Sequence, residues 1–128
     1  MSLHLKVNTY SPQVAYTDLH KLLLITKLSH YTTKSFAAHE ALGKTYDALN
    51  ELLDDITEKI IGYSSIDPQA LVIGTVSPLD PQALSVYTMN IAKRLEEWAE
   101  SQEYCDIENL AQELSGVGAK LKYLSRFK

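Results

Sequence analysis

Four side chains in this sequence have the chemical types that metal binding requires. His30 and His39 offer imidazole nitrogens, and Asp54 and Glu58 offer carboxylate oxygens. Histidine combined with carboxylate suits iron or zinc, whereas ligand sets made only of oxygen suit magnesium or calcium. We therefore take these four residues as the candidate metal ligands, with iron or another divalent metal as the expected ion.

The spacing of these residues restricts how they can meet. His39 and Asp54 both fall within one expected helix, and a rise of 1.5 Å per residue separates them by about 22 Å along its axis. They cannot bind one ion within a single chain. If two copies pack this helix antiparallel, however, His39 of one copy can face Asp54 and Glu58 of the other. The spacing predicts either no joint site or a site shared between subunits.

Each candidate also has a simpler structural interpretation. His39 occupies one of the apolar positions of its helix, and a histidine at such a position is more often a hydrogen-bonded core residue than a metal ligand. Asp54 and Glu58 continue a row of carboxylates that begins with Asp47 and Glu51. Such a row is more often the solvated face of an amphipathic helix than a ligand set.

Length and composition exclude several classes of protein. The chain has 128 residues, of which 45% are hydrophobic, and a formal net charge of −4, which is typical of one globular domain. The single Cys105 cannot form an internal disulfide, and no apolar run approaches the ~18 residues of a membrane span. The first residues lack the apolar segment of a signal peptide. These features predict a cytoplasmic protein without a membrane partner.

Apolar spacing of 3 and 4 predicts an all-α fold with four helices. The expected ranges are about 15–29, 36–61, 81–104 and 107–126, joined by a long connection over about 62–80. The second helix has the clearest pattern, and its apolar seam comprises His39, Leu42, Tyr46, Leu49, Leu53, Ile56 and Ile60. The middle connection is long enough to cross the length of the bundle. We therefore expect a single domain over residues 1–128, a ferritin-like four-helix bundle with a crossover between its second and third helices.

Local signals mark the expected helix ends. Ser35 is a candidate N-cap of the second helix, and Gly62 is a candidate stop after it. The pentapeptide Asp-Pro-Gln-Ala-Leu occurs at residues 67–71 and again at 80–84, and Asp followed by Pro is typical of a helix start. We expect a short helical turn at the first copy and the true start of the third helix at the second. Gly116 and Gly118 predict a close helix contact or a bend.

The sequence resembles the Dps proteins, the mini-ferritins. The resemblance rests on His30-Tyr31, on Ser35-Phe36-Ala37-Ala38-His39-Glu40-Ala41-Leu42, and on Asp54 and Glu58, which stand fifteen and nineteen positions after His39. In that family two histidines come from one subunit and two acids from its two-fold mate. The stretch from His30 to Ile56 is even more similar to small bacteriophage proteins regarded as ferritin-like. The gap of nine between His30 and His39 is shorter than the usual twelve, and the N-terminus lacks the lysine-rich tail that many Dps proteins use on DNA.

The resemblance implies a Dps-like protein that oxidises or sequesters Fe(II) at a site shared between subunits of a homodimer or larger homo-oligomer. The alternative is a phage-encoded interaction protein on the same scaffold, with a decayed metal site, that binds a host or virion partner or a small ligand in the host cytoplasm. DNA is an unlikely partner, because a net charge of −4 without a basic arm gives little affinity for phosphates.

Overall fold

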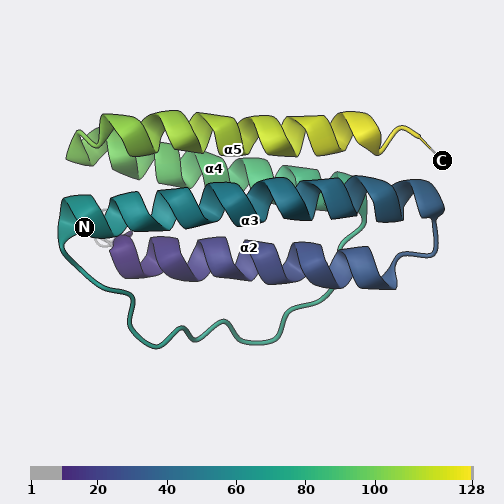
Figure 1. The fold of residues 1–128 in the computed structure, drawn as a ribbon, viewed down its shortest axis with the longest axis horizontal. Coiled ribbons are helices and arrows are strands. Elements are labelled where there is room, and N and C mark those ends of the chain that lie inside the picture. The colour runs from purple at the N-terminus through teal and green to yellow at the C-terminus, as the bar shows by residue number, and fades with distance from the viewer. Residues whose placement is uncertain (1–9, 128) are drawn as a thin grey trace, which may run out of the picture.

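The computed structural model describes residues 10–127, which form four α-helices and no strand. The helices are α2 (Pro12–Thr32), α3 (Phe36–Ser64), α4 (Pro81–Gln102) and α5 (Cys105–Leu124). They lie side by side as an elongated bundle, in which α2 and α3 form one antiparallel hairpin and α4 and α5 form another (Figure 1). The prediction of an all-α fold with four helices is confirmed. Residues 1–9, the N-terminal stretch that lacks a lysine-rich tail, lie outside the described residues.

Side-chain caps explain where three of the helices begin. The Oγ of Ser11 accepts a hydrogen bond from the backbone N–H of Val14 at 3.3 Å, and Ser35 caps α3 in the same way. The Oδ1 of Asp80 accepts from the N–H of Ala83 at 2.9 Å. Each cap satisfies a backbone N–H that has no partner within its helix. The expected caps at Ser35 and Asp80 are therefore confirmed.

Helix ends and the first pentapeptide differ from the sequence-based expectation. α2 begins at Pro12 rather than near residue 15, and α5 begins at Cys105 rather than at 107. α3 continues through Gly62 to Ser64, where Ser65 takes a left-handed conformation with φ of 59°. The first copy of the pentapeptide, residues 67–71, is not helical, so the expectation of a short turn there is wrong. Its cap-and-proline chemistry can start a helix, but it cannot maintain one without an apolar face to bury.

A single core runs along the bundle axis. It contains the expected apolar residues of all four helices, including Leu19, Leu49, Leu95 and Leu114, each at most 1% exposed. The seam of α3 is confirmed at Leu42, Leu49, Leu53, Ile56 and Ile60. His39 and Tyr46 do not follow it, because His39 is exposed and Tyr46 is only partly buried.

The expected close helix contact occurs at Gly118. A Cβ built there would lie 2.8 Å from the side chain of Met89 and 3.0 Å from the backbone oxygen of Ser85, both on α4. A Cβ on Gly116 would meet nothing within 4 Å. Gly118 therefore lets α4 and α5 approach closely, and Gly116 has no such role.

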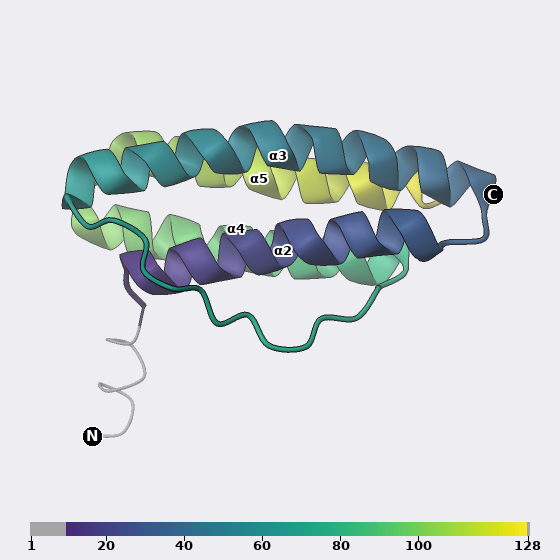
Figure 2. The ribbon, with the colours of Figure 1, turned by 60° about the horizontal axis from the view of Figure 1, so that its bottom comes forward.

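The connection over residues 65–80 runs along α2 from one end of the bundle to the other (Figures 1 and 2). Near the start of α2, the Tyr16 hydroxyl donates to the carbonyl oxygen of Ile66. Near its end, the Oγ of Ser29 accepts from the N–H of Leu79 at 2.9 Å. These hydrogen bonds attach both ends of the connection to one helix. Within residues 10–127, no helix has the length and apolar content of a membrane span.

Candidate metal centre at the corner between α2 and α3

The two candidate histidines meet where α2 turns into α3. His30 lies in the last turn of α2 and His39 in the first turn of α3, and residues 33–35 join the two helices. Their imidazole rings stack with centroids 4.1 Å apart and planes inclined by 18°. The shorter gap of nine residues therefore still brings the two rings together.

A reciprocal pair of hydrogen bonds fixes both rings. His30 Nδ1 lies 2.9 Å from the carbonyl oxygen of His39, and His39 Nδ1 lies 3.1 Å from the carbonyl oxygen of His30. Because a carbonyl oxygen only accepts, we assign the proton of each ring to Nδ1. The Nε2 of each neutral imidazole then carries a free lone pair. A backbone carbonyl on one ring nitrogen is also the arrangement that orients metal-binding histidines in proteins.

Gly43 makes room for the ring of His30. A Cβ at residue 43 would lie 3.0 Å from His30 Cε1 and 3.4 Å from Nδ1, which is tighter than ordinary van der Waals contact. Gly43 stands one turn after His39, so α3 presents a position without a side chain beneath the His30 ring. Sequence reasoning missed this residue. Its signal was a glycine within an otherwise strong helix pattern, which usually has a packing or functional reason.

A hollow of about 320 Å³ opens beside the histidine pair. Two of its lining residues contact each other, since Lys27 Nζ lies over the Tyr46 ring at 5.7 Å from the ring centre. The hollow brings cationic, acidic and aromatic side chains from both helices to one place. It is lined by Lys27, His30, Tyr31, Glu40, Gly43, Lys44, Tyr46 and Asp47.

The stacked rings limit how a metal can bind. A metal–nitrogen bond is about 2.1 Å long and lies close to the plane of its imidazole. Two nearly parallel rings with centroids 4.1 Å apart cannot both meet this condition at one ion. Each Nε2 therefore either binds its own ion, or one ring rotates when a shared ion binds.

The two candidate acids do not join this pair within one chain. Asp54 and Glu58 are exposed on α3, in a row with the equally exposed Asp47 and Glu51. Among residues 10–127, no three His, Cys, Asp or Glu side chains gather closely enough to hold a metal ion. The interpretation of His39 as a core residue is wrong, because His39 is exposed. The interpretation of Asp54 and Glu58 as part of a solvated helix face agrees with the exposure of both residues in the single chain.

A second polar cluster, between α2 and α4, was not expected from the sequence. Arg94 Nη1 lies 3.0 Å from Asp18 Oδ2, although this oxygen has no aligned hydrogen-bond donor. The guanidinium also lies 5.3 Å from the centre of the Tyr10 ring. Burial raises the pKa of the Asp18 carboxyl, and the nearby Arg94 and Lys21 only partly offset this effect. The cluster is partly closed to water, so we interpret it as a structural contact between the two hairpins.

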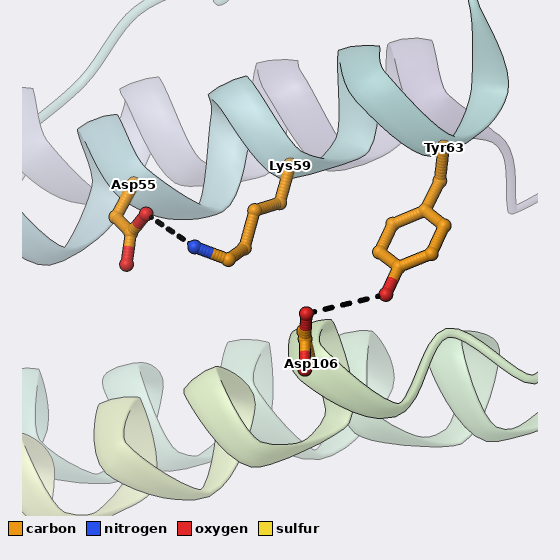
Figure 3. A network of polar contacts seen from close by, with 4 residues as sticks. All are labelled: Asp55, Lys59, Tyr63 and Asp106. Atoms are coloured by element: carbon orange, nitrogen blue, oxygen red, sulfur yellow. Dashed lines mark hydrogen bonds and ion pairs between the residues drawn. The ribbon is translucent and has the colours of Figure 1, made fainter.

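The face shared by α3 and α5 carries two further polar contacts. Lys59 Nζ donates to Asp55 Oδ1 at 2.8 Å, and this hydrogen bond raises the pKa of the lysine. The Tyr63 hydroxyl donates to Asp106 Oδ2 at 3.3 Å, from α3 to the start of α5 (Figure 3). Cys105, beside that aspartate, is exposed and free. The Tyr63–Asp106 contact joins the two helices, whereas the Lys59–Asp55 pair lies within α3.

Comparison with known proteins places the chain in a family. No curated protein matches it, and no solved structure matches it. A family model matches residues 30–124, which is most of the chain and includes His30, His39, Asp54 and Glu58. The chain therefore belongs to DUF5856, a family of unknown function.

Proposed function

We propose that the protein is a Dps-like iron-binding protein in which two copies share each site. The observation that carries the proposal is the stacked pair His30 and His39, whose Nδ1 atoms are held by carbonyl oxygens. Both Nε2 atoms are thereby prepared as ligands at the edge of the bundle. In this proposal Asp54 and Glu58 of a second copy supply the carboxylate oxygens.

The pairing of two α3 helices follows from their charges. An antiparallel pairing that places His39 opposite Asp54 and Glu58 of the second copy also places Lys44 near Glu51 of that copy. All five side chains are exposed. Lys44 of one copy would thus lie at the acidic row of the other, which favours this orientation over a parallel one.

The mixed ligand set suits an ion that changes its oxidation state. Imidazole nitrogen and carboxylate oxygen both bind iron. Two Fe²⁺ ions give one electron each, and one hydrogen peroxide takes these two electrons with two protons to form two waters. The bound Fe³⁺ would then be stored or released. In this chemistry the iron is the substrate, and the residues of the chain hold it within reach of the oxidant.

The arrangement of the bundle agrees with this proposal. Two antiparallel hairpins joined by one long connection along the bundle are features of ferritin-like folds. The connection here lies along α2 and is held at both of its ends. We therefore include a ferritin-like topology in the proposal.

The test is the rate of Fe²⁺ oxidation by peroxide in the presence of purified protein. We expect the protein to accelerate oxidation, and His39→Ala and Asp54→Asn each to remove the acceleration. His20→Ala is a matched control, because the His20 ring hydrogen-bonds to the Tyr16 carbonyl of its own helix at 2.7 Å and does not belong to the candidate site. Glu97→Gln is the matched control for the loss of an exposed carboxylate, because Glu97 lies on α4. Unchanged rates in His39→Ala and Asp54→Asn would contradict the proposal.

A second candidate function is an interaction protein on the same scaffold. It is favoured by apolar side chains that the connection presents to solvent, with Val72 85% exposed and Ile66 47% exposed. Metal analysis of protein purified without chelator separates the two functions. Stoichiometric iron, zinc or manganese supports the first, and metal-free folded protein supports the second.

A further inference from the structure

A groove between α3 and α5 combines an apolar floor with an acidic rim. Its volume is about 490 Å³. Leu52, Leu110 and Val117 line it and also pack against the core. Glu51 and Glu113 stand on its two sides. This combination suits a segment that offers both apolar and cationic side chains.

The negative charge of the rim is only partly neutralised within the chain. Asp55, also at the groove, forms an ion pair with Lys59 (Figure 3). Glu51 and Glu113 are exposed, and neither forms an ion pair with another described residue. Two carboxylates are thus available to a cation that enters from outside.

A segment of matching chemistry lies at the end of α5. Tyr123 and Phe127 are 53% and 55% exposed, and their rings form an edge-to-face pair with centroids 5.4 Å apart. The Arg126 guanidinium lies 5.9 Å from the Tyr123 ring, and Lys122 is exposed beside it. We call Lys122, Tyr123, Arg126 and Phe127 the C-terminal knob. Neither of its cations forms an ion pair with a residue in 10–127.

The knob cannot enter the groove of its own chain. Leu110, Glu113 and Val117 lie on α5, and the same uninterrupted helix continues through Tyr123 to Leu124. Because a helix is stiff, Tyr123 stays about 9 Å beyond Val117 along the axis. The groove must therefore be filled from another molecule, or remain in water.

We propose that the C-terminal knob of one copy docks in the α3–α5 groove of a second copy. The aromatic pair would cover Leu52, Leu110 and Val117, and the knob cations would approach the two free carboxylates of the rim. The knob is cationic and the groove rim is acidic, and one chain carries both surfaces. This charge complementarity favours a second copy as the partner that fills the groove. The contact uses neither His39 nor Asp54. Glu51 belongs both to this groove and to the α3 pairing of the iron proposal, whereas Glu113 on α5 belongs to the groove alone.

The first test is the mass of the full chain in solution, measured by sedimentation velocity over a range of concentration. We expect self-association that weakens by about tenfold or more in a knob variant, Tyr123→Ser with Phe127→Ser, and in a groove variant, Glu113→Lys. Val86→Ser is the matched control, because Val86 is a 46% exposed apolar residue of α4 that belongs to neither surface. Association should also weaken from about 0.02 M to about 0.5 M salt.

Two further measurements decide the outcome even if one variant folds poorly. Knob and groove variants mixed in equal amounts should associate again, because each still carries the surface that the other lacks. The groove variant should also recover when one knob cation is reversed in the same chain, as Lys122→Glu or Arg126→Glu. Unchanged mass in both variants would overturn the proposal. It would also be overturned if the knob variants kept their self-association but lost binding to single-stranded RNA or to anionic vesicles. Unchanged mass in His39→Ala would separate this contact from the iron site.

Discussion

Gly43 lies directly beneath the imidazole of His30, so that a Cβ at residue 43 would stand 3.0 Å from Cε1 of the ring. His30 comes from α2, and Gly43 lies one turn after His39 on α3. The missing side chain lets the His30 ring lie against α3 and stack on His39 at 4.1 Å. The geometry of the candidate site thus depends on Gly43, which has no side chain that could bind a metal.

Gly43→Ala should displace the His30 ring and weaken metal binding without unfolding the helix. Gly62→Ala is the matched control in the same helix, because a Cβ there meets nothing within 4 Å. The control should gain about 0.5–1 kcal/mol of stability, the usual difference between alanine and glycine inside a helix. Imidazole signals in NMR spectra and metal titration provide the measurements. Equal metal affinity in the two variants would show that the ring position is not required.

Gly118→Ala should destabilise the bundle by about 1–3 kcal/mol, the usual cost of overpacking. The added methyl would meet the Met89 side chain, which can move, and the Ser85 backbone oxygen at 3.0 Å, which cannot move without shifting α4. Gly116→Ala, two residues away in open space, should stabilise the fold instead. Urea unfolding of both variants measures the difference. Similar free energies of unfolding would contradict the close contact between α4 and α5.

Ser29→Ala should release one end of the long connection. The buried Ser29 Oγ accepts from the Leu79 N–H at 2.9 Å and donates to the Ile25 carbonyl at 2.7 Å. Its loss leaves a partly buried N–H without a partner, at a cost of about 1–3 kcal/mol. Limited proteolysis should cut residues 65–80 faster. Ser101→Ala, which removes only an exposed bond within α4, should leave the cutting rate unchanged.

Asp18→Asn should change how stability depends on pH. Burial raises the pKa of Asp18 in the folded protein, above about 3.9 in the unfolded chain. The folded state then binds the proton more tightly, so the contribution of Asp18 to stability is full below that value and is lost as pH rises through the folded pKa. The free energy of unfolding of the wild type, minus that of Asp18→Asn, should fall as pH rises from the unfolded pKa of Asp18 through its folded pKa.

Arg94→Gln provides the second arm of this test. Arg94 lowers the pKa of Asp18 and opposes the effect of burial, so its removal should extend the fall to higher pH. Urea unfolding at a series of pH values measures both variants. A wild-type advantage over Asp18→Asn that grows with pH would mean that the ion pair outweighs burial.

Local chemistry predicted the helices well but could not predict every helix start. Asp67–Leu71 and Asp80–Leu84 have the same sequence, yet only the second begins a helix. After Leu84 the chain continues with buried residues at helical spacing, the polar Thr88 and the apolar Ile91 and Leu95. After Leu71 it continues with β-branched residues and Gly74, whose φ is +77°. A helix start therefore needs a following apolar face that can be buried, as well as a cap.

The candidate site was predictable in its residues and not in its geometry. The residue types indicated His30 and His39, and the helix rise showed that Asp54 could not reach them in one chain. Stacking of the two rings depends on the three-residue corner and on the space above Gly43, which are properties of two packed helices. The raised pKa of Asp18 likewise comes from burial between helices far apart in sequence. Such features arise only when the helices assemble.

The most direct test of the shared site is complementation between two inactive chains. One chain carries His30→Ala and His39→Ala, and the other carries Asp54→Asn and Glu58→Gln. Each alone should fail to accelerate Fe²⁺ oxidation by peroxide. After the two are unfolded and refolded together in equal amounts, random pairing into dimers should restore about a quarter of the wild-type rate. A refolded mixture as inactive as its two components would contradict a site built from the histidines of one copy and the acids of another.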